Sequence, residues 1–152
     1  MKLIWRTKLY DELSLDELYS ILKIRQEVFV VEQNCPYLDC DGLDKKAIHI
    51  LGFFDNKLIS YMRILRTVEV SSPHLGRLYF GRILVSKNKR KLGLGEKVML
   101  EALSYSEDNY PGELVEMSAQ AYLVNFYKKF KFKVLGKEYL EDGIPHVKMI
   151  KN

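Results

Sequence analysis

The segment that most constrains the fold of this chain is ILVSKNKRKLGLGEKVML, from Ile83 to Leu100. An apolar run of strand length leads into a basic turn, and Gly93 and Gly95 then open a segment whose apolar residues recur at helical spacing. A second apolar run of strand length, ELVEMSA, begins at Glu113. A strand, a helix and a strand in this order predict a parallel strand pair joined by a right-handed crossover.

The N-terminal half predicts one helix followed by strands. Ser14 and Glu17 are spaced as a capping box, and apolar residues at helical spacing extend the predicted helix to about Val31. The runs AIHILGFFD and LISYMRILR, on either side of a turn at residues 55–57, predict a β-hairpin. A third apolar run, LYFGRILVS, predicts a strand, and the segment VSSPHLGR before it is expected to loop out.

The C-terminal part predicts a helix in YLVNFYKKF and two closing strands around a turn at Asp142 and Gly143. At 152 residues, with 47% apolar residues and no linker-like segment, residues 1–152 are expected to form one domain with a substantial core. The predicted fold class is α/β, with a mixed, mostly antiparallel sheet and flanking helices.

Charge and composition limit the classes of partner. The net charge of +4 comes from 24 basic and 20 acidic side chains spread along the chain, which argues against a nucleic-acid-binding protein. There is no signal-peptide pattern and no run of 18 apolar residues, so a cytoplasmic protein without a membrane span is expected. Cys35 and Cys40 are expected to be free thiols, although a disulfide between them stays open, and no metal site is predicted.

Arg90, Gly93 and Gly95 form the pattern R-x-x-G-x-G between the predicted strand and helix. Glycines let the backbone approach a ligand closely, and the first turn of a helix offers unpaired N–H groups to an anion. The pattern fits neither a Walker A loop nor a dinucleotide-binding fingerprint. Taken alone, it is equally consistent with a phosphate site and with a glycine turn beside a solvated basic face.

Two longer segments decide between these interpretations by resemblance. ILVSKNKRKLGLGEKVMLEAL is similar to the acetyl-coenzyme A (acetyl-CoA) signature of the GNAT superfamily of N-acetyltransferases, and SAQAYLVNFYKKFKF resembles the second signature of that superfamily. The segments IRQEVFVVEQNCPYLDCDGLD and YLEDGIPHVKM are similar to its ElaA-like subgroup. One departure is Lys131, which stands where these proteins usually have a glycine.

The resemblance implies a single GNAT-type domain in which the parallel strand pair splays apart, with acetyl-CoA or CoA in the gap. Backbone groups of the first strand would pair with the pantetheine arm, and N–H groups at the start of the helix would hold the pyrophosphate. The implied cofactor-binding residues are Ile83, Leu84, Val85, Arg90, Lys91, Leu92, Gly93, Leu94, Gly95, Glu96, Gln120, Asn125, Phe126, Tyr127 and Phe130.

The implied reaction is direct acetyl transfer to a primary amine of a small molecule or protein. Tyr127 matches the position that often supplies the proton to the departing thiolate, so it is the first catalytic candidate. An ammonium group must lose a proton before it attacks, and the candidates for the base are Glu116, His146 and Glu32. Glu116 has a competing structural interpretation, as an ion-pair partner of Arg82 on the neighbouring strand.

Acceptor binding is expected at the acidic loop from Glu32 to Asp44 and at Glu141 and Asp142, because carboxylates attract a cationic amine. A solvated acidic loop without a ligand is an equally weighted alternative. The predicted acceptor-binding residues are Phe29, Glu32, Gln33, Tyr37, Asp39 and His146. An alternative is a non-catalytic protein of the same fold that binds or senses acyl-CoA. Both a monomer and a homodimer are compatible with the sequence.

Overall fold

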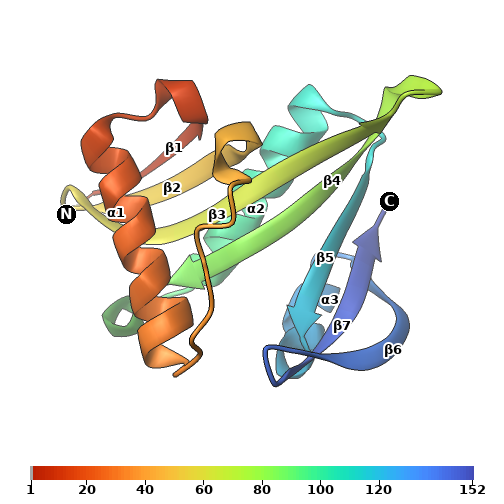
Figure 1. Ribbon diagram of the computed structural model, residues 1–152. Coiled ribbons are helices and arrows are strands. Elements are labelled where there is room, and N and C mark those ends of the chain that lie inside the picture. Colours follow the sequence, from red (N-terminus) through yellow and green to blue (C-terminus); the bar gives the residue numbers. More distant parts are fainter. Residues whose placement is uncertain (1) are drawn as a thin grey trace.

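The computed structural model describes residues 2–152, and for residues 69 and 72–74 it describes the backbone only. Seven strands form one sheet in the order β1-β2-β3-β4-β5-β7-β6, in which only β4 and β5 are parallel neighbours (Figure 1). The strands are β1 (Leu3–Leu9), β2 (Ile48–Phe54), β3 (Lys57–Glu69), β4 (Ser72–Val85), β5 (Leu114–Gln120), β6 (Lys133–Glu141) and β7 (Ile144–Lys151).

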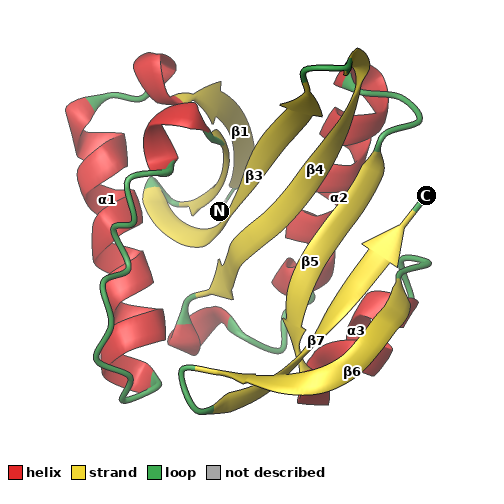
Figure 2. Ribbon diagram, turned by 45° about the vertical axis from the view of Figure 1, so that its right-hand side comes forward, coloured by secondary structure: helices red, strands yellow, loops and turns green. Residues whose placement is uncertain are grey.

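Helices cover both faces of this sheet, and their side chains form two separate core clusters (Figure 2). The helices are α1 (Leu15–Arg25), α2 (Leu94–Asn109) and α3 (Val124–Lys128), and a seven-residue π-helical segment (Gln26–Glu32) continues α1. Alternate residues of a strand point to opposite faces, so in β3 Tyr61 packs toward α1 while Met62 packs toward α2. Burial on both faces explains why β2 is apolar except for His49 and shows no alternation of apolar and polar residues.

The parallel pair separates at its C-terminal end. Pairing of β4 with β5 extends only from Arg77 opposite Leu114 to Phe80 opposite Met117, although both strands continue beyond these residues. Next to this point, β4 carries one extra residue relative to β3, and Arg82 adopts a φ of 52°. Such a bulge bends its strand, which explains why β4 diverges from β5 and opens a gap between them (Figure 2).

Several predicted elements are confirmed. The capping box at the start of α1 is present, because Ser14 Oγ accepts from the Glu17 N–H at 3.0 Å and the Glu17 carboxylate accepts from the Ser14 N–H at 2.9 Å. The strand-helix-strand unit and the hairpins also form as expected. Lys131 has a φ of 69°, so the turn after α3 keeps the left-handed conformation that a glycine would adopt easily.

Two predictions about local structure are wrong. β1 was not expected; it is stabilised by pairing with β2, from Leu3 opposite Phe54 to Leu9 opposite Ile48, which a local pattern does not reveal. The segment VSSPHLGR does not loop out, because β4 begins at Ser72 and pairs with β3 almost to the tip of a long hairpin. Cys35 and Cys40 are free thiols.

A buried ion-pair network attaches the loop after the π-helical segment to α1 and the sheet. Arg25 is fully buried and donates to Asp39 at 2.9 Å and to Asp44 at 2.6 Å. Arg82 of the β4 bulge donates to Asp39 at 2.8 Å, so one aspartate joins the helix to the bulge. Two more members, Arg63 and Asp41, complete a set of three arginines and three aspartates.

His49 lies next to this network and predicts a pH effect on stability. Its ring is fully buried, and burial lowers its pKa below the ordinary value of 6.5, so the folded state holds it neutral. Below about pH 6.5 the unfolded chain binds a proton that the folded chain does not, so the free energy of unfolding decreases as the pH falls. We expect the decrease to be at most about 1.4 kcal/mol per pH unit. Urea unfolding between about pH 7.5 and pH 5.5 measures it, and His49→Gln should flatten the profile. An unchanged slope in that variant would refute the assignment.

Candidate active site

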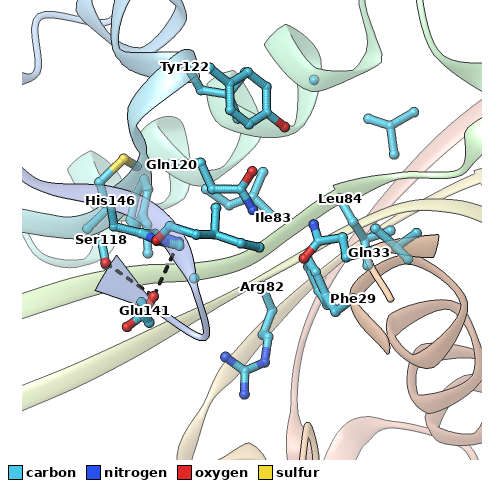
Figure 3. A pocket seen from close by; sticks show the side chains of 18 of the residues that line it. Phe29, Gln33, Arg82, Ile83, Leu84, Ser118, Gln120, Tyr122, Glu141 and His146 are labelled. Carbon is cyan, nitrogen blue, oxygen red and sulfur yellow. Dashed lines mark hydrogen bonds and ion pairs between the residues drawn. The ribbon is translucent and has the colours of Figure 1, made fainter. Parts of the chain in front are cut away.

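A cavity of about 880 Å³ occupies the gap between the diverging ends of β4 and β5. This volume lies within the usual range of small-molecule sites. The π-helical segment forms one wall, and β5 with the β6–β7 turn forms the other (Figure 3). The predicted site residues that line it are Phe29, Glu32, Gln33, Tyr37, Ile83, Leu84, Val85, Arg90, Leu94, Gly95, Gln120, Phe126, Tyr127 and His146.

The start of α2 has the features of an anion site. Gly93 precedes the helix with a φ of 73°, and no side chain caps its first turn. The N–H groups of that turn therefore have no intrahelical partner. A Cβ atom on Gly93 would meet no protein atom within 4 Å, so it would project into open space at the head of the helix. Backbone donors, a positive helix end and open space together fit a phosphate group.

Arg90 joins this turn to the π-helical segment and to the end of β4. Its guanidinium forms a two-pronged ion pair with Glu32, with a distance of 2.7 Å from Nη2 to Oε2, and its Nε donates to the Val85 carbonyl at 3.1 Å. The hydrogen bond from Arg90 lowers the pKa of Glu32, so this carboxylate is a weaker base than an isolated glutamate. This ion pair makes Glu32 a less suitable base among the three candidates, Glu116, His146 and Glu32, that the sequence offered for the amine proton.

Tyr127 projects from α3 into the cavity between two aromatic rings. The Phe126 and Phe132 rings pack edge-on against it, with centroid distances of 5.1 Å and 6.4 Å. Burial raises the pKa of Tyr127 to about 12, and its hydroxyl makes no hydrogen bond to any residue in the described part of the chain. The side chain is thus a neutral phenol at physiological pH, with its proton free for a ligand.

His146 lies on β7, at the end of the β5–β7 ladder, where it pairs with Gln120. Its Nδ1 lies 2.7 Å from the Ile144 carbonyl, which can only accept, so Nδ1 carries a proton. The other ring nitrogen, Nε2, lies 3.3 Å from Glu141 Oε2 (Figure 3). In the neutral ring Nε2 therefore holds a lone pair and can accept a proton.

Other predicted residues are not brought into the cavity. Glu116 does not line it among the described residues, and it pairs with Arg77 at 3.1 Å and Lys148 at 3.9 Å. The expected pair with Arg82 is wrong, because the bulge turns Arg82 toward Asp39. The remaining predicted residues outside the lining are the exposed Lys91, Leu92, Gly93, Glu96 and Asn125, the buried Phe130 and Asp39.

The expectation that the acidic loop offers free carboxylates is also wrong. Asp39 is buried between Arg25 and Arg82, and Tyr37 donates to it at 2.9 Å. The hydrogen bond from Arg63 lowers the pKa of Asp41. The loop aspartates are therefore neutralised within the fold and are not available to an acceptor amine, whereas Glu141 and Asp142 do line the cavity.

Known proteins show which family this chain is similar to. The family model described as acetyltransferase (GNAT) domain matches residues 27–152. The chain belongs to the GNAT family. Protein ElaA of Escherichia coli strain K12 is 40% identical to this GNAT domain over 147 residues, covering 95% of this chain and 94% of ElaA. The ElaA-like resemblance is thereby confirmed.

Solved structures show the same fold over the whole of this GNAT domain. The crystal structure of E. coli ElaA has a TM-score of 0.90 at 38% identity and covers 98% of this chain and 99% of that one. The crystal structure of an acyl-CoA N-acyltransferase from Pseudomonas aeruginosa has a TM-score of 0.92 at 38% identity and covers 99% of this chain and 100% of that one. None of the helices within residues 2–152 combines the length and apolar character that a membrane span requires.

Proposed function

We propose that this protein is an N-acetyltransferase that uses acetyl-CoA as donor and a primary amine as acceptor. The observation that carries the proposal is the gap between β4 and β5. The uncapped start of α2 lies beside this gap, and Tyr127 and His146 line the cavity within it. Membership of the GNAT family and the likeness to an acyl-CoA N-acyltransferase support it.

The donor would lie along the gap, with the pyrophosphate at the first turn of α2 and the pantetheine arm beside the unpaired end of β4. The residues that would hold it include Ile83, Val85, Gly93 and Gly95. Val85 O already accepts from Arg90, but a carbonyl oxygen has a second lone pair. Bound acetyl-CoA supplies an acetyl thioester that is open to attack by an amine.

His146 would act as the general base of this reaction, and Tyr127 as the general acid. The amine attacks only after it loses a proton, and His146 Nε2 can accept that proton in the neutral ring, because Nδ1 holds the ring proton against the Ile144 carbonyl. Tyr127 gives its phenol proton to the departing sulfur. Of the two remaining candidate bases, Glu116 lies outside the cavity lining and Glu32 is paired with Arg90, which favours His146.

Thermal melting with and without acetyl-CoA, followed by thiol release with a panel of amines, tests the proposal. We expect acetyl-CoA to raise the melting temperature, since a ligand that binds the folded state stabilises it, and we expect thiol release to depend on an added amine. No stabilisation would contradict donor binding. Stabilisation without turnover on any amine would favour the alternative of a non-catalytic acyl-CoA-binding protein.

Gly93→Val should abolish the stabilisation by acetyl-CoA. Valine at a φ of 73° is strained, and its side chain would occupy the open space at the head of α2. Gly136→Val is the matched control, because Gly136 has a φ of 84° with open space around its Cβ position but lies on β6, outside the cavity lining. Both variants should melt at a lower temperature than the wild type, and only Gly93→Val should lose the response to acetyl-CoA in a melting assay. An equal response in both would remove Gly93 from the donor site.

A further inference from the structure

Four polar residues form a hydrogen-bonded cluster, which we call the acceptor cup: Ser118, Glu141 and His146, which line one end of the cavity, and Tyr139, which bonds to Ser118. They come from β5, β6 and β7, and Figure 3 shows Ser118, Glu141 and His146 together on one wall, with Phe29 and Gln33 on the other. Sequence analysis did not identify Ser118 or Tyr139, because only the pairing of the three strands brings them together.

The contact between His146 and Glu141 joins two hydrogen-bond acceptors when the imidazole is neutral. His146 is only 7% exposed, and its Nδ1–H is committed to Ile144 O, so the lone pair of Nε2 faces Glu141 Oε2 at 3.3 Å. Two acceptors at hydrogen-bond range are stable only when a donor lies between them or when one is protonated. A bound cation with N–H groups would supply that donor.

The cup also has the right number of acceptors for an ammonium group. Ser118 Oγ donates to the same Glu141 oxygen at 3.4 Å and bonds to the Tyr139 hydroxyl, and the oxygens of these two hydroxyls keep lone pairs that can accept. The side chain of Glu141 is 52% exposed, so a ligand in the cavity can reach it. A primary ammonium carries three N–H donors, and the carboxylate, the imidazole nitrogen and the hydroxyl pair offer three acceptors.

The charges around the cup disfavour a ligand that carries a carboxylate next to its amine. Asp142 lines the cavity next to Glu141, so a ligand carboxylate beside the amine would meet two negative side chains. The two arginines that line the cavity do not offset this, because Arg82 is paired with Asp39 and Asp41 and Arg90 is paired with Glu32.

We propose that the acceptor cup binds a primary alkyl ammonium without a neighbouring carboxylate, with Glu141 as the residue that binds the ammonium. The inference rests on the proposed acetyl transfer. The C–N bond forms and the thioester C–S bond breaks. One ammonium proton passes to His146 Nε2 and then to solvent, and the second replaces the proton that Tyr127 gives to the sulfur, so each transfer releases one proton.

Steady-state kinetics with a matched pair of amines tests the acceptor class. Butylamine and norvaline differ only in the α-carboxylate, and we expect kcat/KM to be at least about tenfold higher for butylamine, since the carboxylate meets like charge at close range. Glu141→Gln should raise the KM for butylamine at least about tenfold and leave the KM for acetyl-CoA unchanged, because it removes a charge-assisted hydrogen bond. Ser118→Ala should raise it less.

Glu138→Gln is the control, because Glu138 lies on the same strand, is exposed and is not part of the cavity lining. Two results would overturn the inference and leave the proposed function intact. One is amine-dependent turnover in which Glu141→Gln does not change the KM for butylamine. The other is a wild-type protein that prefers norvaline to butylamine.

A binding measurement that needs no turnover separates the two proposals further. In the complex with CoA, titration with butylammonium should shift the His146 ring signals in the NMR spectrum in a saturable way, with the signals assigned by His146→Gln. Glu141→Gln should weaken this binding at least about tenfold. Absence of a saturable shift in the wild type would overturn the inference, and absence of CoA binding would instead overturn the proposed function.

Discussion

Tyr127→Phe is expected to lower kcat about 100-fold or more and to change the dissociation constant of acetyl-CoA by less than about threefold, as for the loss of a general acid. The phenylalanine ring keeps the packing against Phe126 and Phe132 and removes only the hydroxyl, which makes no hydrogen bond to the described residues. Burial raises the pKa of this phenol to about 12, so the wild-type side chain keeps its proton at physiological pH and can donate it to the sulfur as the C–S bond breaks.

Thiol release at saturating amine measures kcat for this variant, and calorimetric titration measures the donor affinity. Tyr105→Phe is the control, because it removes a hydroxyl from α2 outside the cavity lining. Unchanged turnover in Tyr127→Phe would remove this residue from the mechanism.

Arg25→Met is expected to lower the free energy of unfolding by about 3–5 kcal/mol, the range for breaking a buried ion pair from one side. Arg25 is fully buried and compensates both Asp39 and Asp44. Burial alone would raise the pKa of Asp44, and the hydrogen bonds from Arg25 and Arg63 outweigh it and lower that pKa instead. Without Arg25, the network keeps three buried or half-buried carboxylates with two arginines.

Denaturant unfolding measures this loss, and Lys23→Met is the control, because Lys23 is exposed on the same helix. A decrease in Arg25→Met no larger than that in Lys23→Met would show that the network contributes little to stability. Because Asp39 also holds Arg82 in the β4 bulge, the variant should in addition weaken acetyl-CoA binding at the gap that the bulge opens.

The elements that local residues determine could be predicted from the sequence. The capping box at Ser14 and Glu17 set the start of α1, and the glycines at 93 and 95 marked the start of α2. β1 could not be predicted with the same reasoning, because it is stabilised by β2, some 40 residues further along the chain. The π-helical segment after α1 was predicted as ordinary helix, since apolar spacing does not distinguish the two.

The candidate site also has a part that local residues determine and a part that depends on strand pairing. Most residues of the proposed donor site lie in one continuous segment, from Ile83 to Glu96, and Gly93 precedes α2 there with a left-handed backbone. The proposed acceptor cup is assembled from three strands, β5, β6 and β7, so Ser118 and Tyr139 had no recognisable spacing. The clustered aspartates of the loop were predicted to bind the acceptor amine. They instead form ion pairs with three arginines from separate elements, and local sequence does not reveal these pairs.

The measurement that tests the central claim most directly is product analysis after incubation with acetyl-CoA and butylamine. Mass spectrometry would quantify the acetylated amine, and a thiol reagent would quantify the released CoA. We predict equal amounts of amide and free thiol with the wild-type protein, and a large decrease of both in Tyr127→Phe and His146→Gln. Thiol release without amide, or amide formation that both variants retain in full, would contradict amine acetylation by these residues.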